Sequence, residues 1–182
     1  MTIPDLATAL ETSDELFDRE TLQDAIKEMA VMINHDYEER DRPVLLSVMH
    51  GGMIFASLLS LELDFDVEVD YLHATRYRGA MSGSGLAWLH RPATPLEGRY
   101  VLIADDILDE GHTLKAVKQW CEDQGAIEVR IAVLAVKIHD RRVEDIDAEY
   151  VGVEVPDRYV YGFGMDYHEQ GRNLPGLYAL EN

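Results

Sequence analysis

Residues 101–114, VLIADDILDEGHTL, contain the pattern that decides the fold of this 182-residue chain. Four apolar residues lead into a segment with three aspartates and a glutamate, and helix-forming sequence begins at Thr113. An apolar run that can be buried on both faces is typical of a central strand in a parallel sheet. The pattern therefore predicts a strand over residues 101–104, an acidic turn, and a helix that continues to Gly125.

The rest of the chain alternates predicted strands and helices. Residues 14–40 are predicted to be helical, because one face of that helix would carry Leu22, Ala25, Ile26, Met29, Ala30 and Ile33. A second helix is predicted over residues 53–61. Strands are predicted over residues 44–49, 67–72, 86–90, 127–138, 149–155 and 157–161. This order predicts an α/β fold, with a mostly parallel twisted sheet flanked by helices, in a single domain spanning residues 1–182.

The composition limits the possible partners. Thirty-five acidic and 16 basic residues give a net charge of −19, which repels nucleic acid and anionic membranes. The longest uninterrupted apolar run, residues 131–136, is too short to span a bilayer, and the first residues lack the pattern of a secretory signal. We therefore expect a cytoplasmic protein that binds neither nucleic acid nor membrane. A phosphate ester would have to be held by close groups, such as a helix N-terminus, a metal ion or single Lys and Arg side chains.

The acidic segment can serve a phosphorylated sugar. Asp105 and Asp106 can accept hydrogen bonds from a vicinal diol or hold Mg²⁺, while the backbone N–H groups at the helix start bind a phosphate. A plain alternative is that Asp109 or Thr113 only caps the helix and the other carboxylates are solvated. The whole pattern of strand, paired aspartates, third aspartate, glycine and threonine favours the functional interpretation.

This segment resembles the phosphoribosyl pyrophosphate (PRPP) signature of the type I phosphoribosyltransferases, and in particular that of the hypoxanthine-guanine enzymes. The resemblance implies that Asp105 and Asp106 meet the ribose hydroxyls, directly or through Mg²⁺, and that Asp109 faces the purine N7 as a general acid/base. The turn that would wrap the 5-phosphate consists of Glu110, Gly111, His112 and Thr113. The family usually has Thr at the position of Glu110, so only its backbone amide is carried over, and its carboxylate is expected to point away.

Two further segments are similar to loops of the same family. SVMHGG, residues 47–52, resembles the pyrophosphate loop, which implies that His50 and Gly51 bind the leaving group and that the Met49–His50 peptide bond is cis. RYRGAMSGSG, residues 76–85, is predicted to be a mobile loop and resembles the catalytic lid, with Tyr77 near its start. The family also implies a small hood formed by terminal segments.

The C-terminal third resembles the family's base-recognition region in VKIHD at 136–140 and VPDRYVYGFGMDYHEQGRNLP at 155–175. The resemblance implies that Lys137 donates to the purine 6-oxygen, that Tyr159 stacks on the ring, and that backbone groups around Val160 read the ring edge. It also implies that Asp166 binds Mg²⁺ together with Asp105, and that Arg172 reaches the pyrophosphate. Because an ammonium can only donate hydrogen bonds, Lys137 would favour an oxo over an amino group.

The expected activity is purine salvage, with PRPP and hypoxanthine or guanine giving IMP or GMP and pyrophosphate. The choice among hypoxanthine, guanine and xanthine stays open, as does the choice between a homodimer and a homotetramer. One alternative is an RNA-binding regulator that reuses the fold, which would need a basic face. Another is a receiver-type phosphoacceptor domain, which also has paired aspartates at a strand end.

Overall fold

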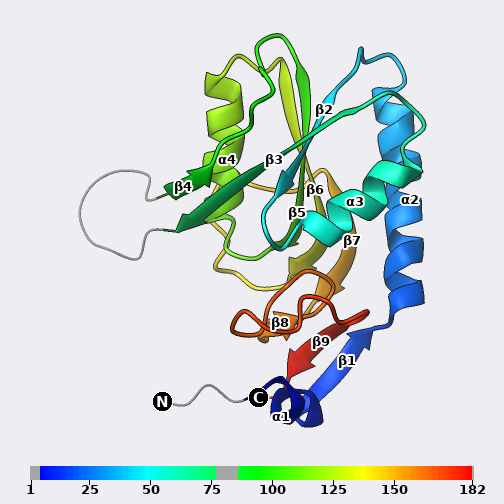
Figure 1. Ribbon diagram of the computed structural model, residues 1–182, viewed down its shortest axis with the longest axis vertical. Coiled ribbons are helices and arrows are strands. Elements are labelled where there is room, and N and C mark those ends of the chain that lie inside the picture. Colours follow the sequence, from blue (N-terminus) through cyan, green and yellow to red (C-terminus); the bar gives the residue numbers. More distant parts are fainter. Residues whose placement is uncertain (1–4, 77–85, 182) are drawn as a thin grey trace.

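The computed structural model describes residues 5–76 and 86–181. Its larger sheet has six strands in the order β4-β3-β2-β5-β6-β7 (Figure 1). The strands of this sheet are β2 (Val44–Val48), β3 (Glu68–Arg76), β4 (Leu86–His90), β5 (Tyr100–Leu108), β6 (Glu128–Lys137) and β7 (Tyr150–Val155). All neighbouring pairs are parallel except β3 and β4. The loop predicted over residues 76–85 starts one residue too early, since Arg76 ends β3; its remaining residues, Tyr77 included, lie outside the described residues.

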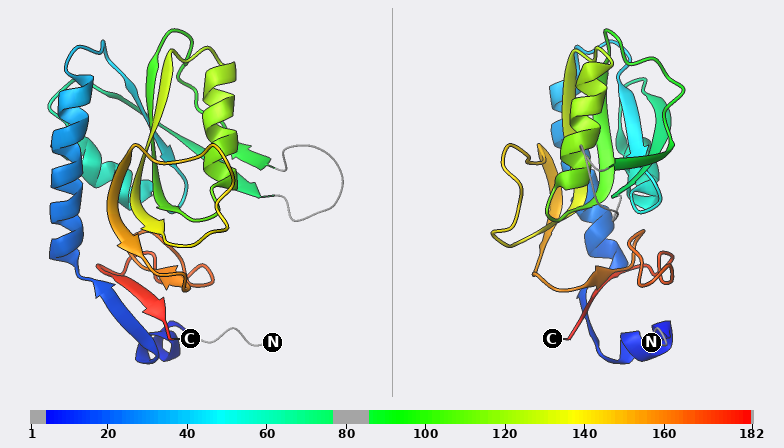
Figure 2. Two further views of the ribbon diagram at one scale, coloured as in Figure 1. Left: turned by 180° about the vertical axis from the view of Figure 1, so that it is seen from behind. Right: turned by 90° about the vertical axis from the view of Figure 1, so that its left-hand side faces the viewer.

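Helices cover both faces of this sheet, so the expected α/β architecture is confirmed (Figure 2). On one face, α2 (Arg19–Tyr37) and α3 (Met53–Glu62) pack against Leu45, Leu102 and Ala104. On the other face, α4 (His112–Asp123) packs against Val101 and Ile103. Successive residues of β5 thus enter two different cores, which is why its sequence is apolar without alternation.

A second sheet forms the hood below the main sheet (Figure 1). Its strands are β1 (Ser13–Phe17), β9 (Leu177–Leu180) and β8 (Val160–Tyr161), in the order β1-β9-β8 and antiparallel throughout. The short helix α1 (Leu6–Glu11) precedes β1, and Ala9 of α1 packs in one cluster with Tyr161. Both ends of the described chain therefore contribute to the hood, as the resemblance implies.

Several predicted boundaries were wrong. The helix predicted from residue 14 begins at Arg19, because Asp18 caps it by accepting a hydrogen bond of 2.9 Å from the Thr21 N–H. Residues 13–17 instead pair with β9, a partner more than 150 residues away that local periodicity does not reveal. The strand predicted over residues 157–161 shortens to Val160–Tyr161, and α1 and β9 were not predicted.

The strand predicted over residues 101–104 is longer than expected, since β5 continues to Leu108. Asp105 and Asp106 therefore lie in the strand and not in a turn. The neighbouring β6 is long enough to pair with this extension, with Asp105 opposite Val133 and Leu108 opposite Val136. No helix within the described ranges is long and apolar enough to cross a membrane.

Candidate active site

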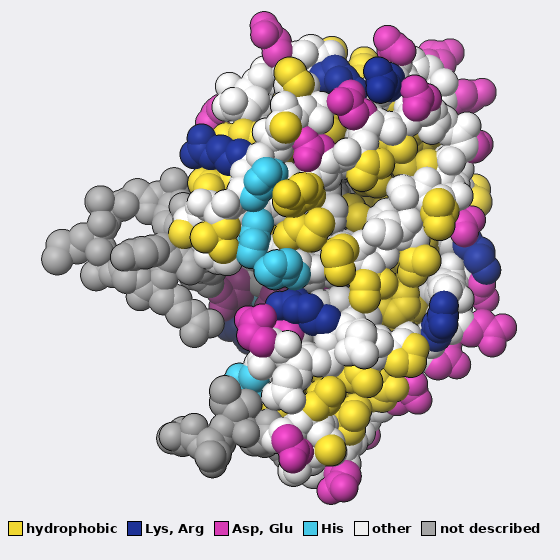
Figure 3. Space-filling model, in the orientation of Figure 1, with side chains coloured by type: hydrophobic (Ala, Val, Ile, Leu, Met, Phe, Trp, Pro, Cys, Tyr) yellow, Lys and Arg dark blue, Asp and Glu magenta, His cyan; other side chains and the backbone are white. Residues whose placement is uncertain are grey.

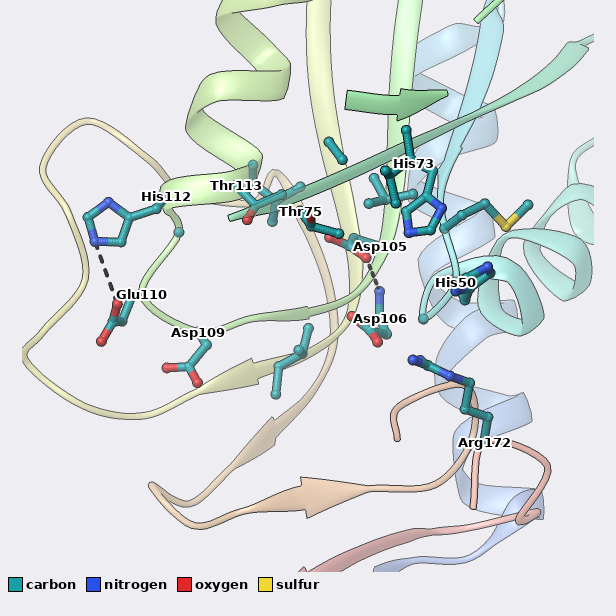
Figure 4. Close-up of a pocket in the computed structure, with 18 of the residues that line it drawn as sticks. His50, His73, Thr75, Asp105, Asp106, Asp109, Glu110, His112, Thr113 and Arg172 are labelled. Carbon is teal, nitrogen blue, oxygen red and sulfur yellow. Dashed lines mark hydrogen bonds and ion pairs between the residues drawn. The ribbon is translucent and has the colours of Figure 1, made fainter. Parts of the chain in front are cut away.

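A cavity of about 740 Å³ opens at the carboxyl ends of β2 and β5, beside the start of α4 (Figure 4). Open α/β folds bind ligands at this edge of the sheet, where the strand ends and helix starts meet. All of the residues predicted to bind the phosphate, ribose and pyrophosphate line it together with the predicted general base, namely His50, Gly51, Asp105, Asp106, Asp109, Glu110, Gly111, His112, Thr113 and Arg172. The structure therefore brings together residues from three segments that the sequence singled out separately.

Two adjacent carboxylates lie on the floor of the cavity. Asp105 is buried, and its Oδ1 accepts a hydrogen bond of 2.9 Å from the Asp106 N–H. Burial raises the pKa of Asp105 well above its ordinary value, and the neighbouring charge of Asp106 raises it further. Burial also raises the pKa of Asp106, although the positive charge of Arg172 opposes that shift. Adjacent acids whose pKa values are raised, one buried and one partly buried, are sites where a cation or hydroxyl donors would be favourable partners.

Gly51 allows the turn after β2 to lie directly against this acid pair. A Cβ atom at Gly51 would be 1.7 Å from Oδ2 of Asp106, so no other residue fits without moving that carboxylate. The preceding Met49–His50 peptide bond is cis, which confirms what the resemblance implies.

The start of α4 has the form of an anion site. Gly111 is its N-cap, with a left-handed φ of 84° and no side-chain cap. The first N–H groups of a helix have no partner within the helix, and the helix dipole favours a negative charge there. A Cβ at Gly111 would come within 2.6 Å of Ile146 Cγ2, so the glycine is required by both conformation and packing. This arrangement can bind the phosphate that the sequence pattern predicts.

The Glu110 carboxylate is directed toward the His112 ring, with 3.5 Å between Oε2 and Nε2, on the side away from Asp105 and Asp106 (Figure 4). The Glu110 carbonyl accepts a hydrogen bond of 2.9 Å from the Val143 N–H. The backbone of this turn is therefore tied to the loop after β6. That its carboxylate avoids a bound phosphate stays a prediction.

Asp109 follows β5 and is held by two residues from the end of β6. Lys137 Nζ donates to Oδ2 over 2.7 Å, and His139 Nε2 lies 2.7 Å from Oδ1. Burial by itself would raise the pKa of Asp109, but the hydrogen bonds and charges of Lys137 and His139 bring it below its ordinary value. Asp109 is therefore an ionised carboxylate over the physiological pH range.

The residues predicted to recognise the purine lie beside the cavity but do not line it. Lys137 contacts Asp109, which lines the cavity. Asp166 contacts Arg172, which also lines it, with 2.7 Å between Arg172 Nη2 and Asp166 Oδ1. The Tyr159 hydroxyl donates to the Asp166 carbonyl over 3.2 Å, and its side chain is exposed. Val160 is buried in β8, opposite Ala179 of β9.

A basic edge faces the carboxylates across the cavity. The rings of His50 and His73 are in edge contact, with centroids 4.4 Å apart. Burial lowers the pKa of His73, and the neighbouring His50 and Arg172 lower it further. Histidine side chains gather on this face of the molecule beside basic and acidic groups (Figure 3). Arg172 supplies the positive charge of this edge, and the ring N–H of a neutral histidine can donate to a polyanion such as pyrophosphate.

Sequence reasoning did not assign every residue at this site. His73, Thr75, Leu89 and Glu169 line the cavity, and His139 contacts Asp109. His139 had a usable signal, because a residue two positions after Lys137 at a strand end projects to the same side. His73 had no comparable signal, since its position depends on the pairing of β3 with β2.

A Mg²⁺ ion at this site would need substrate oxygens to complete its ligands. Across residues 5–76 and 86–181, no three His, Cys, Asp or Glu side chains are grouped so as to hold a metal ion. Asp166 already engages Arg172 and the Glu169 N–H with its two oxygens. Mg²⁺ is commonly held by one or two carboxylates together with substrate phosphates, and the cavity-lining Asp105 and Asp106 fit that role.

Comparisons with known proteins agree with this geometry. Residues 12–169 match the phosphoribosyl transferase domain. The chain is 34% identical over 168 residues to the hypoxanthine-guanine phosphoribosyltransferase of Staphylococcus epidermidis, covering 91% of this chain and 92% of the relative. It is 31% identical over 166 residues to the hypoxanthine-guanine-xanthine phosphoribosyltransferase of Tritrichomonas foetus, covering 91% and 90%. A crystal structure of a hypoxanthine phosphoribosyltransferase from Staphylococcus aureus superposes with a TM-score of 0.88 at 29% identity, covering 97% of this chain and 96% of the other.

Proposed function

Because this chain belongs to the phosphoribosyl transferase domain family, among the hypoxanthine-guanine phosphoribosyltransferases, we propose that it transfers the 5-phosphoribosyl group of PRPP to hypoxanthine or guanine. The products are IMP or GMP and pyrophosphate, which makes the reaction a step of purine salvage. One observation carries the proposal: a single cavity joins the uncapped start of α4 to the buried Asp105 and the partly buried Asp106.

PRPP binds across the cavity in this proposal. Its 5-phosphate accepts hydrogen bonds from the backbone N–H groups of residues 110–113. Its ribose hydroxyls donate to Asp105 and Asp106, and its pyrophosphate lies against the backbone of His50 and Gly51, where Arg172 supplies a positive charge. When Mg²⁺ is bound, it neutralises part of the charge on the pyrophosphate and makes it a better leaving group.

Asp109 acts on the purine. The bond between the ribose carbon and pyrophosphate loosens, and the purine N9 attacks that carbon while Asp109 accepts the proton from N7. Carboxylates near the ribose stabilise the positive charge that develops on the sugar, and Arg172 stabilises the negative charge on the departing pyrophosphate. The low pKa of Asp109 keeps it in the ionised form that this step needs.

Lys137 and Tyr159 select the base. The Lys137 ammonium lies beside the cavity, 2.7 Å from Oδ2 of Asp109. It can donate a hydrogen bond to a 6-oxo group but cannot accept one from a 6-amino group. The exposed Tyr159 ring offers a stacking surface, and backbone groups around Val160 read the ring edge. This set favours hypoxanthine and guanine over adenine.

A coupled assay of pyrophosphate release tests the proposal, with PRPP and Mg²⁺ and with adenine, hypoxanthine, guanine or xanthine as the base. Release with hypoxanthine or guanine and not with adenine supports it. The name of the T. foetus relative includes xanthine, so a preference for xanthine is the second candidate. Absence of release with all four bases would refute the enzymatic proposal.

Two further expectations concern partners. We expect a cytoplasmic homodimer or homotetramer, which size-exclusion chromatography with light scattering can distinguish. RNA binding is the weaker alternative because the net charge is −19. A filter-binding assay at moderate salt would reveal it.

A further inference from the structure

His139 is an almost completely enclosed side chain to which the proposed reaction gives no role. Its side chain is 2% exposed, whereas the carboxylate of Asp109 that it contacts is 41% exposed. His139 does not line the cavity, so it has no direct access to a substrate there. Any effect of His139 on the reaction must therefore pass through Asp109.

The hydrogen bonds of the His139 ring determine which nitrogen carries its hydrogen. The Arg141 N–H donates to Nδ1 over 3.0 Å, so Nδ1 is an acceptor. The hydrogen of a neutral ring is then on Nε2, and His139 donates it to Oδ1 of Asp109. The turn that orients the ring is itself anchored, because the Arg141 guanidinium makes two hydrogen bonds, of 2.6 and 2.8 Å, to Asp157.

Lys137 and His139 differ in how firmly they can hold the carboxylate. Lys137 contacts Oδ2 through a flexible stem with three N–H donors, and recognition of a 6-oxo purine requires it to turn toward the base. His139 has one donor, is packed on all sides and is fixed by the turn behind it. His139 can therefore keep its contact with Asp109 unchanged when a purine binds, whereas Lys137 must share its donors between Asp109 and the base.

We infer that His139 is a positioning residue for Asp109: it holds Oδ1 in place so that Oδ2 faces the purine N7 when Lys137 turns to the 6-oxygen. This inference rests on the proposed function. As the bond between N9 and the ribose carbon forms and the bond to pyrophosphate breaks, the N7 proton passes to Oδ2 of Asp109. His139 keeps its own Nε2 hydrogen throughout. The hydrogen bond from His139 also favours the ionised carboxylate after Lys137 has turned away.

The His139 donor also affects the pH at which Asp109 loses activity. The charged or titratable groups around the Asp109 carboxylate are Lys137 and His139 from the end of β6, Glu110 and His112 from its own turn, and Arg141 with Asp157 behind His139. Loss of the donor at His139 removes one of the groups that stabilise the ionised Asp109. The acid limb of kcat therefore moves to higher pH when that donor is removed.

Two substitutions separate positioning from simple structural support. In His139→Asn, the short amide can still meet the Arg141 N–H but cannot reach Asp109. In His139→Gln, the amide nitrogen lies at about the distance of the missing Nε2 and can donate to Oδ1. His35→Asn is the matched control, because His35 is exposed on α2, away from the cavity.

Initial rates with saturating PRPP and hypoxanthine test the inference over a range of pH. We expect His139→Asn to lower kcat about tenfold with little change in the KM for PRPP, because a misplaced general base loses part of its rate enhancement. Its acid limb moves to higher pH, and His139→Gln restores most of kcat and of the wild-type profile. His35→Asn behaves as wild type.

Two outcomes would overturn the inference. One is a wild-type kcat and pH profile in His139→Asn. The other is an equal loss in the Asn and Gln variants with an unmoved acid limb, which would mean that the ring only supports the fold. Failure of the proposed function is recognised separately, because the wild-type protein would then release no pyrophosphate with any purine.

Discussion

Replacement of Asp109 by asparagine separates catalysis from binding at this site. The two side chains have nearly the same shape, but an amide cannot take a proton from the purine N7. Asp109 lines the same cavity as Asp105 and Asp106, but the proposed contacts to PRPP come from those two residues and not from Asp109. PRPP should therefore still bind to the variant. Loss of the general base is expected to lower kcat by about 10² or more, which corresponds to about 2.7 kcal/mol of barrier.

The structure also predicts the effect of Asp109→Asn on stability. The variant loses the charge that pairs with Lys137, whose side chain is only 12% exposed. Because Asp109 itself is 41% exposed, the pair is partly screened by solvent, and its loss should cost about 0.5–1 kcal/mol. For a chain of this size the melting temperature would fall by about 1–4 °C. The loss of turnover is therefore much larger than unfolding could explain.

Steady-state pyrophosphate release at saturating hypoxanthine and varied PRPP measures both kcat and the KM for PRPP. We expect the KM for PRPP to stay within about twofold of wild type while kcat falls. Asp147→Asn is a matched control, since Asp147 is an exposed carboxylate paired with Arg142 outside the cavity. A wild-type kcat in Asp109→Asn would remove Asp109 from the proposed role, whereas an equal loss in the control would indicate a nonspecific charge effect.

Three further predictions concern other residues of the site. Lys137→Gln should lower kcat/KM for hypoxanthine by about 10- to 100-fold and reduce the preference for hypoxanthine over adenine, since a hydrogen bond to a charged group contributes about 1.5–3 kcal/mol. An unchanged ratio of kcat/KM for hypoxanthine to kcat/KM for adenine would contradict this. Gly51→Ala should raise the KM for PRPP about tenfold or more, because its Cβ would lie 1.7 Å from Oδ2 of Asp106, and an unaltered KM would contradict it. Asp105→Asn should raise the melting temperature of the ligand-free protein at neutral pH, because burial raises the pKa of Asp105 and the folded state binds a proton that the unfolded chain releases. That gain should shrink as the pH falls toward about 4, the ordinary carboxyl range, and a gain independent of pH in a thermal denaturation series would refute the reasoning.

Much of the site could be predicted from short segments. The apolar run before Asp105, the glycine of the α4 start and the glycines after β2 each have a local physical meaning, namely burial, a left-handed turn and close approach. The order of these segments along the chain resembles that in the phosphoribosyltransferase family. That resemblance, and not the local pattern, implied the roles of residues such as Lys137 and Arg172. The cavity confirms that the phosphate, ribose and pyrophosphate segments meet, although each role stays a prediction until it is measured.

The hood shows where local patterns stop being informative. Residues 13–17 have no strong strand pattern, and their burial pattern does not alternate. They become β1 because Ser13 pairs with Leu180 at the opposite end of the chain. Likewise, β5 extends past its apolar run to include both aspartates, since β6 provides backbone partners as far as Val136.

The sequence by itself determined the alternation of strands and helices, the acidic signature and the family, because each of these depends on residues that are neighbours along the chain. Only the tertiary structure decided that His139 and Lys137 share the carboxylate of Asp109, and that His73 lies against His50. Those contacts join residues more than 20 positions apart, and they exist only because parallel pairing brings the carboxyl ends of separate strands to one edge of the sheet.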